Sequence, residues 1–102
     1  MSGRVLVLGS LNVDLVTRVE RHPRPGETVA GEGLQQLAGG KGANQAVAAA
    51  AAGASVSMAG CVGDDAGGAA YRRRLEALGV DVAGVRVCPG VPTGTAIVTV
   101  AD

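Results

Sequence analysis

The sequence predicts an α/β fold, in which a partial Rossmann-like parallel sheet carries helices on its faces and a small β-ribbon lies beside it. Short valine-rich runs alternate with alanine-rich or amphipathic stretches, which is the order of βαβ units. The run Val5–Leu8 is continuously apolar, as in a strand covered on both faces. Hydrophobic residues make up 47% of the 102 residues, enough for a core in one small domain or in part of a larger one.

In the first half of the chain we expect three strands, one turn and one helix. The strands lie at 4–9, 15–20 and 28–37, the turn lies at 23–26, and the helix covers 43–52 and ends at Gly53. The two later strands mix polar and apolar residues and form an exposed ribbon. Pro25 fixes φ in the turn and Gly26 tolerates a positive φ.

The second half continues the alternation with a helix between strands. We expect strands at 55–62, 85–88 and 95–100, a turn at 89–92, and a helix that Asp64 or Asp65 caps and that stops at Gly79. In this helix Tyr71, Leu75 and Leu78 fall at i, i+4 and i+7, so they form one apolar stripe facing the sheet.

Charge and cysteine content narrow the classes of function. Nine basic and nine acidic residues give a net charge of zero, which disfavours nucleic acid or an anionic membrane surface as a partner. Neither a signal peptide nor a spanning segment is expected, which indicates a cytoplasmic protein. Cys61 and Cys88 are far apart in the sequence and lack a neighbouring histidine. We therefore expect two buried, reduced thiols and no metal site.

The run from Gly39 to Ala46 is the strongest indication of a binding site. Its glycines let the backbone approach a ligand, and the helix that follows leaves N–H groups unpaired at its start. Lys41 and Asn44 add donors there, and Asn12 and Asp14 follow the first strand, where ligands collect in open α/β sheets. Together these residues predict a pocket for a small, hydroxyl-rich molecule.

Each of these residues also has an ordinary interpretation. Asp14 can be a turn residue, Asn12 can cap a turn, Lys41 can be a solvated lysine and Asn44 an early helix residue. Two phosphate-binding motifs are excluded, because Gln35 and Gly42 break the P-loop spacing and the dinucleotide pattern also fails.

Three further groups of side chains are interpreted as structural. Arg72, Arg73 and Arg74 fan around a helix and form a solvated face. His22 precedes Pro23 in the expected turn and has no second catalytic partner in the sequence. Asp64 and Asp65 are interpreted as residues that cap the second helix.

Five ordered segments resemble the ribokinase-like (PfkB) family of carbohydrate kinases. They are Gly9–Asp14, Pro23–Thr28, Gly39–Ala46, Gly63–Asp65 and Pro92–Ala96. The resemblance runs along essentially the whole chain. It implies ATP-dependent phosphorylation of the 5-hydroxyl of ribose, with Mg²⁺ and a monovalent cation such as K⁺ as cofactors.

The resemblance also implies roles for individual positions. Those that would hold the sugar hydroxyls are Asn12, Asp14, Gly40, Lys41 and Asn44. The strands at about 15–37 and 94–100 would form a lid, and lid strands in this family often pair two subunits into a homodimer.

Residues 1–102 match only the N-terminal part of a single family domain. Members are longer, and their nucleotide site and catalytic aspartate lie in a C-terminal part with no match here. We therefore expect this chain to be inactive alone, since phosphoryl transfer needs a base and donors for the developing charge. Two alternatives stay open: a catalytically inactive, truncated remnant that binds sugar or dimerises, and a kinase of another pentose, a nucleoside or a sugar phosphate.

Overall fold

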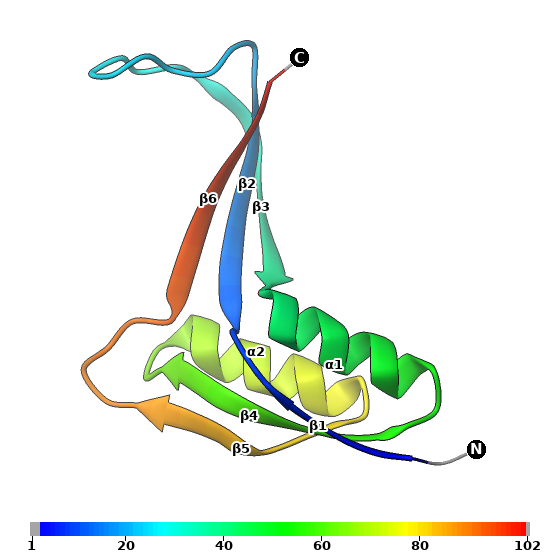
Figure 1. Cartoon of the computed structure of the whole chain (residues 1–102). Helices are drawn as coiled ribbons and strands as arrows, with labels where there is room; N and C mark the ends of the chain where they lie inside the picture. Colours follow the sequence, from blue (N-terminus) through cyan, green and yellow to red (C-terminus); the bar gives the residue numbers. More distant parts are fainter. Residues whose placement is uncertain (1–2, 102) are drawn as a thin grey trace.

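A computed structural model describes residues 3–101, which form two three-stranded sheets and two helices (Figure 1). The elements are β1 (Arg4–Leu8), β2 (Asn12–Val19), β3 (Gly31–Gly39), α1 (Lys41–Ala51), β4 (Ser55–Gly63), α2 (Ala66–Ala77), β5 (Val80–Cys88) and β6 (Gly94–Ala101). The expected α/β class is confirmed. The expected domain range also includes residues 1, 2 and 102, which lie outside the described residues.

The first sheet is parallel, has the order β1-β4-β5, and carries both helices on one face (Figure 1). We call it the helix-covered sheet. Alternate residues of its strands point toward the helices, and Met58 of β4 and Leu75 of α2 are fully buried between the two layers. The core contains one aromatic ring, that of Tyr71, and otherwise consists of aliphatic side chains and alanine.

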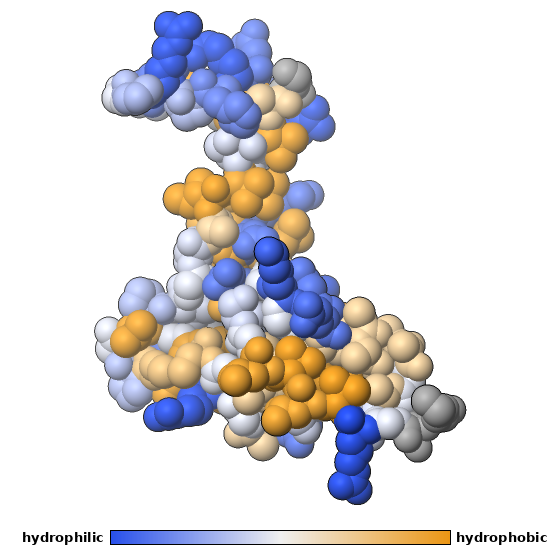
Figure 2. All heavy atoms as spheres, viewed as in Figure 1, coloured by the Kyte–Doolittle hydropathy of each residue, from blue (hydrophilic) through white to orange (hydrophobic). Residues whose placement is uncertain are grey.

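The other face of the helix-covered sheet carries apolar side chains that are exposed. Leu6 and Leu8 of β1 are 70% and 82% exposed. Figure 2 shows a hydrophobic patch on the part of the molecule that contains the helix-covered sheet. It shows a second patch along the three strands that project away from the helices.

The second sheet has the order β3-β2-β6 and projects away from the helices (Figure 1). We call it the lid sheet. Strand β2 pairs antiparallel with β3 and parallel with β6, and its pairing with β3 shifts register between Val16 and Arg18. The expected ribbon strands are therefore present, but they form a sheet of their own together with β6.

The ends of several elements differ from the expectation. β2 begins at Asn12, so Asn12 and Asp14 lie inside a strand of the lid sheet and not in a loop after β1. β5 begins at Val80 and not at Val85. The sequence pattern missed the first half of β5 because the alternation of buried valines is broken by one residue between Val82 and Val85. The pairing of β5 with β4 shifts register at the same place.

Both helices have the expected glycine stops, with Gly53 and Gly79 at positive φ. Asp65 is the cap of α2, since its Oδ1 accepts from the Gly68 N–H at 2.8 Å. The expected stripe on α2 is correct for Tyr71 and Leu75. It is wrong for Leu78, which is 43% exposed because it lies at the C-cap.

The arginines of α2 and the two cysteines depart from their expected surroundings. Arg73 and Arg74 are exposed, but Arg72 is half-buried and its Nη2 donates to the Val82 carbonyl at 3.3 Å. Cys61 is exposed and not buried, because it points to the sheet face that the helices leave open.

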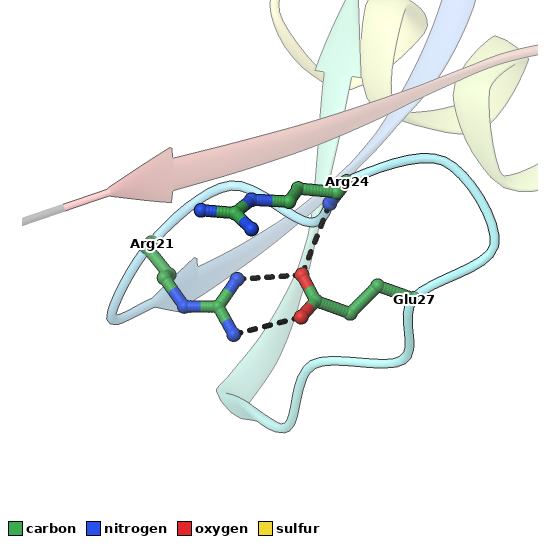
Figure 3. Close-up of polar contacts among 3 residues, drawn as sticks. All are labelled: Arg21, Arg24 and Glu27. Atoms are coloured by element: carbon green, nitrogen blue, oxygen red, sulfur yellow. Dashed lines mark hydrogen bonds and ion pairs between the residues drawn. The ribbon is translucent and has the colours of Figure 1, made fainter.

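At the end of the lid sheet far from the helices, β2 and β3 are joined by a turn that contains Arg21, Arg24 and Glu27. We call it the pinned turn, because hydrogen bonds among these residues hold it. Arg21 and Glu27 form two hydrogen bonds of 2.5 and 2.8 Å, and Glu27 Oε1 also accepts from the Arg24 N–H at 3.0 Å (Figure 3). Gly26 has a φ of 75° there. His22 lies beside this turn, with its Nδ1 3.0 Å from Thr99 Oγ1 of β6.

Candidate functional site

The root of the lid sheet, where it meets α1, carries the first two expected site residues. Asn12 and Asp14 lie two apart on β2 and point to the same side of the sheet. Asp14 lies against Gly39, since a Cβ added at Gly39 would stand 2.6 Å from Asp14 Cγ. Asn12 lies against Gly94 of β6 in the same way, with its Oδ1 2.7 Å from such an atom. The two polar side chains thus occupy space that glycines leave open.

Gly40 makes the connection between the lid sheet and α1. Its φ of 101° favours glycine, and a Cβ there would stand 2.9 Å from the Ser10 carbonyl carbon. The first turn of α1 is held by the Ala43 N–H, which donates to the Ser10 carbonyl at 3.2 Å, and by the Asn44 N–H, which donates to the Gly40 carbonyl at 3.0 Å. No side chain caps this helix.

The structure brings four of the five expected residues to this junction. Gly39 is the register partner of Asn12, and Gly40 and Lys41 follow it directly. Lys41 is exposed as the first residue of α1. Asn44 instead lines a separate hollow of about 110 Å³ between the two helices, together with Tyr71 and Arg74.

A second hollow lies on the opposite side of the lid sheet from Asp14. Its volume is about 150 Å³, and Val13, Ala38 and Tyr71 contribute to its lining. Val13 alternates with Asn12 and Asp14 along β2, so this space faces α2 and not the two polar side chains.

Tyr71 contacts the junction, although the sequence pattern assigned it only to the core. Its hydroxyl donates a hydrogen bond to the Gly39 carbonyl, which places it beside the junction. Burial raises the pKa of Tyr71, the charge of Asp14 raises it further, and Arg74 opposes both. One signal was available: the single aromatic residue of the chain lies in a stripe that otherwise needs only aliphatic side chains.

Asp65 and Thr93 fix the other connection to the lid sheet. Asp65 accepts from the Thr93 hydroxyl at 2.6 Å and from the Thr93 N–H at 2.8 Å, and Thr93 Oγ1 in turn accepts from the Gly63 N–H at 2.9 Å. These bonds hold the pKa of Asp65 below its usual value, those from Thr93 contributing most. β6 begins one residue later, so the network sets where Gly94 meets Asn12.

Two general properties concern the whole described range. Among residues 3–101, no three histidine, cysteine, aspartate or glutamate side chains are grouped as a metal site would require. In the same range, neither helix has the length and apolar character needed to cross a membrane.

The pfkB family carbohydrate kinase model matches residues 2–102. The chain belongs to this family. It is 45% identical to ribokinase of Bacillus subtilis over 98 residues and 46% identical to ribokinase of Schizosaccharomyces pombe over 104 residues. Each match covers 96% of this chain but 33% of the relative, so the chain spans about a third of the length of the curated relatives it matches.

Solved structures agree with this assignment. The Arabidopsis thaliana ribokinase complexed with ribose and ATP is 38% identical to this chain, and its structure matches this fold with a TM-score of 0.86. The match covers 99% of this chain and 33% of that one. The fold of the two sheets is thus shared with that relative, which is complexed with ribose and ATP.

Proposed function

We propose that this chain is the sugar-binding part of an ATP-dependent kinase that phosphorylates the 5-hydroxyl of ribose. The observation that supports it best is the pair Asn12 and Asp14, held on one side of β2 next to the Gly39–Gly40 junction. An amide and a carboxylate at this spacing can donate to and accept from neighbouring hydroxyls. The proposal includes a cytoplasmic location.

The proposed roles follow from where the side chains lie. Asp14 accepts from sugar hydroxyls, Asn12 donates or accepts beside it, and Lys41 donates from the start of α1. Gly40 lets the sugar approach the backbone. Asn44 completes the set only if the first turn of α1 presents it to the same ligand, because in this structure it lines the hollow between the helices.

Phosphoryl transfer itself is assigned to residues beyond this set. Transfer needs a base for the attacking hydroxyl and donors for the charge that develops. Asp14 lies against Gly39, and we propose it as a binding group and assign no base among the residues described here. We therefore propose that this part of the chain binds and orients the sugar, and that ATP is the phosphate donor as its bound state in the relative suggests.

Mg²⁺ and K⁺ are also implied by the family resemblance. Among residues 3–101, no three histidine, cysteine, aspartate or glutamate side chains are grouped together. We assign neither cation to this part of the chain, and no step of the proposal runs through one.

Titration calorimetry with ribose tests the proposal. Wild type is expected to bind, and Asp14→Asn to weaken binding roughly 10- to 100-fold, the usual cost of a hydrogen bond to a charged group. Asp64→Asn is the matched control, an exposed carboxylate near the α2 cap, and should bind as wild type. Equal affinities for wild type and Asp14→Asn would refute the assigned role. The same titration with deoxyribose, a nucleoside and a sugar phosphate separates the alternative substrates.

A second candidate function is self-association through the lid sheet. On the side of Asn12 and Asp14, the exposed apolar residues are Leu37, Val98 and Val100. Exposed apolar faces and open strand edges favour pairing with another chain. Val98→Glu is expected to give a monomer in light scattering, whereas Ile97→Glu, on the opposite side of β6, should leave a dimer intact. Monomeric wild type at high concentration would refute this function.

A further inference from the structure

Two cysteines that are 27 residues apart in the sequence lie side by side at the ends of β4 and β5. The Cys88 thiol donates to the Cys61 sulfur, and the two Sγ atoms are 3.1 Å apart. Cys61 is the register partner of Arg86 and Cys88 that of Gly63, so the cysteines are diagonal neighbours on adjacent parallel strands. This pair plays no part in the proposed sugar site.

Both thiols point to the face of the helix-covered sheet that carries no helix. Val62 next to Cys61 is buried against the helices, so Cys61 projects to the opposite side, and the register places Cys88 there as well. Cys61 is exposed and Cys88 is half-buried. A soluble reagent can therefore reach the Cys61 sulfur.

We propose that Cys61 and Cys88 form a reversible intramolecular disulfide, with glutathione disulfide as the oxidant. The sulfur atoms need to close from 3.1 Å to about 2.05 Å. Cys88 is the last residue of β5 and is followed by the turn at Pro89 and Gly90, so the pairing with β4 continues only on its N-terminal side. Closing the bond therefore requires this end of β5 to move toward Cys61.

The difference in exposure assigns the order of attack. The hydrogen bond to Cys61 raises the pKa of the Cys88 thiol, and burial raises it further. Cys61 is the exposed sulfur of the pair and Cys88 is half-buried, so we assign Cys61 as the first nucleophile.

Two exchange steps complete the reaction. The Cys61 thiolate attacks one sulfur of glutathione disulfide, forms a mixed disulfide and releases a glutathione thiolate. That thiolate takes the proton of Cys88, and the Cys88 thiolate then attacks the Cys61 sulfur and expels the second glutathione. Two protein thiols are oxidised, one glutathione disulfide is reduced to two glutathione molecules, and excess glutathione reverses the reaction.

The bond would close a loop that contains the whole of α2. One end of this loop is next to Gly63, whose N–H donates to Thr93. Because a cross-link restricts the unfolded chain, the oxidised form is expected to melt several degrees above the reduced form.

The test is oxidation of the purified chain with glutathione disulfide, followed by denaturation, alkylation with N-ethylmaleimide and intact-mass measurement. Wild type is expected to lose about 2 Da and to take up no alkylating reagent. Neither Cys88→Ser nor Cys61→Ser can close the bond. Cys88→Ser keeps the exposed Cys61 and should gain about 305 Da as one mixed disulfide with glutathione. Cys61→Ser keeps only the half-buried Cys88 and should form the same adduct more slowly. Dithiothreitol should return wild type to two alkylated thiols.

A tryptic map of oxidised wild type gives a second readout that needs no variant. Cleavage at Lys41, Arg72 and Arg86 separates the two cysteines, so the disulfide appears as peptide 42–72 linked to peptide 87–102. Wild type that carries separate glutathiones, stays fully alkylated, or links two chains at twice the mass would overturn the proposal.

Discussion

The hydroxyl of Tyr71 on α2 donates a hydrogen bond to the carbonyl of Gly39, the last residue of β3. Gly39 has Asp14 on its other side, since the Asp14 carboxylate fills the space that a side chain at Gly39 would occupy. One glycine is therefore fixed between a tyrosine from the helix layer and a carboxylate from the lid sheet. This contact connects the core of the helix-covered sheet to the proposed sugar site.

Tyr71→Phe keeps the ring and removes this bond. We expect a loss of about 1 kcal/mol of unfolding free energy, because the Gly39 carbonyl is left without its donor in a buried place. For a domain of this size that corresponds to a fall in Tm of roughly 4–8 °C. Thr17→Val is the matched control, since it removes an exposed hydroxyl bond to the Gly33 carbonyl of the same strand. Equal shifts for the two variants in a thermal melt would contradict the prediction.

We expect the hydrogen bonds by which Asp65 connects α2 to the start of β6 to weaken in acid. Its pKa is lowered in the folded state, so its stabilising effect is full above the unfolded value of about 3.9 and is lost as pH falls through the lower folded value. Asp65→Asn should therefore lower Tm at pH 6 and should flatten the dependence of Tm on pH below 4.

Glu27 also has a lowered pKa, so wild type alone does not isolate the contribution of Asp65. The comparison is therefore between the Tm of Asp65→Asn and that of Asp64→Asn. Both are measured in thermal melts at about six pH values between about pH 2 and pH 7. Asp64→Asn should follow the wild-type curve. A curve for Asp65→Asn parallel to wild type across the acid range would show that the network does not set the pH dependence.

Gly42→Ala tests the close contact between α1 and the chain after β1. Alanine favours a helix over glycine by about 1 kcal/mol. However, the added Cβ would stand 2.7 Å from Gly9 Cα, a backbone contact that a side-chain movement does not relieve. Overpacking of this kind typically costs about 1–3 kcal/mol, so we expect a net loss of stability in denaturant titration.

Gly67→Ala is the control for this substitution. Gly67 also lies in the first turn of a helix, but the nearest atom to its added Cβ would be 3.6 Å away, an ordinary contact. This variant should gain stability from helix propensity alone. Should both alanines stabilise the chain, the close packing of Gly42 on Gly9 would not be the reason for glycine there.

Glu27→Gln tests the pinned turn of the lid sheet. The pair with Arg21 is exposed, so we expect no measurable change in Tm. Locally, the Glu27 N–H bond to the Arg24 carbonyl at 2.9 Å should open more often, which hydrogen exchange of that amide detects as faster exchange. High salt should speed exchange in wild type and leave the variant nearly unchanged. A clear fall in Tm would contradict this assignment.

The sequence pattern predicted both helices and the strands β1 and β4 of the helix-covered sheet, because the helices have glycine stops and these strands are apolar runs, but it missed the first half of β5. It placed the lid sheet less accurately. Most residues of β2 are half-buried and most residues of β3 are exposed, so no strict alternation of buried and exposed positions marks where these strands begin. Asn12 was expected beyond a strand end, but it is the first residue of β2. Polar strands carry a weak pattern, and their bounds follow from pairing partners that the pattern does not reveal.

The candidate site was likewise predicted in part from the sequence. The glycine run predicted a turn into a helix, which the chain adopts at Gly40 and Lys41. The bond from Tyr71 to Gly39 and the contact between Cys61 and Cys88 join residues 32 and 27 apart, and their spacing follows no motif. Such contacts depend on the docking of α2 and on the register of β4 with β5, which only the folded chain sets.

The parallel pairing of β2 with β6 has a consequence for synthesis. Asn12 leaves the ribosome early, yet its partner Gly94 is made only after both helices. Until then the nascent chain can complete the hairpin of β2 and β3, but one edge of β2 stays open and able to accept a foreign strand. The lid sheet therefore acquires its third strand only after the layer of helices has emerged, and slow translation of the segment that encodes β6 would prolong the period in which misassembly competes with folding.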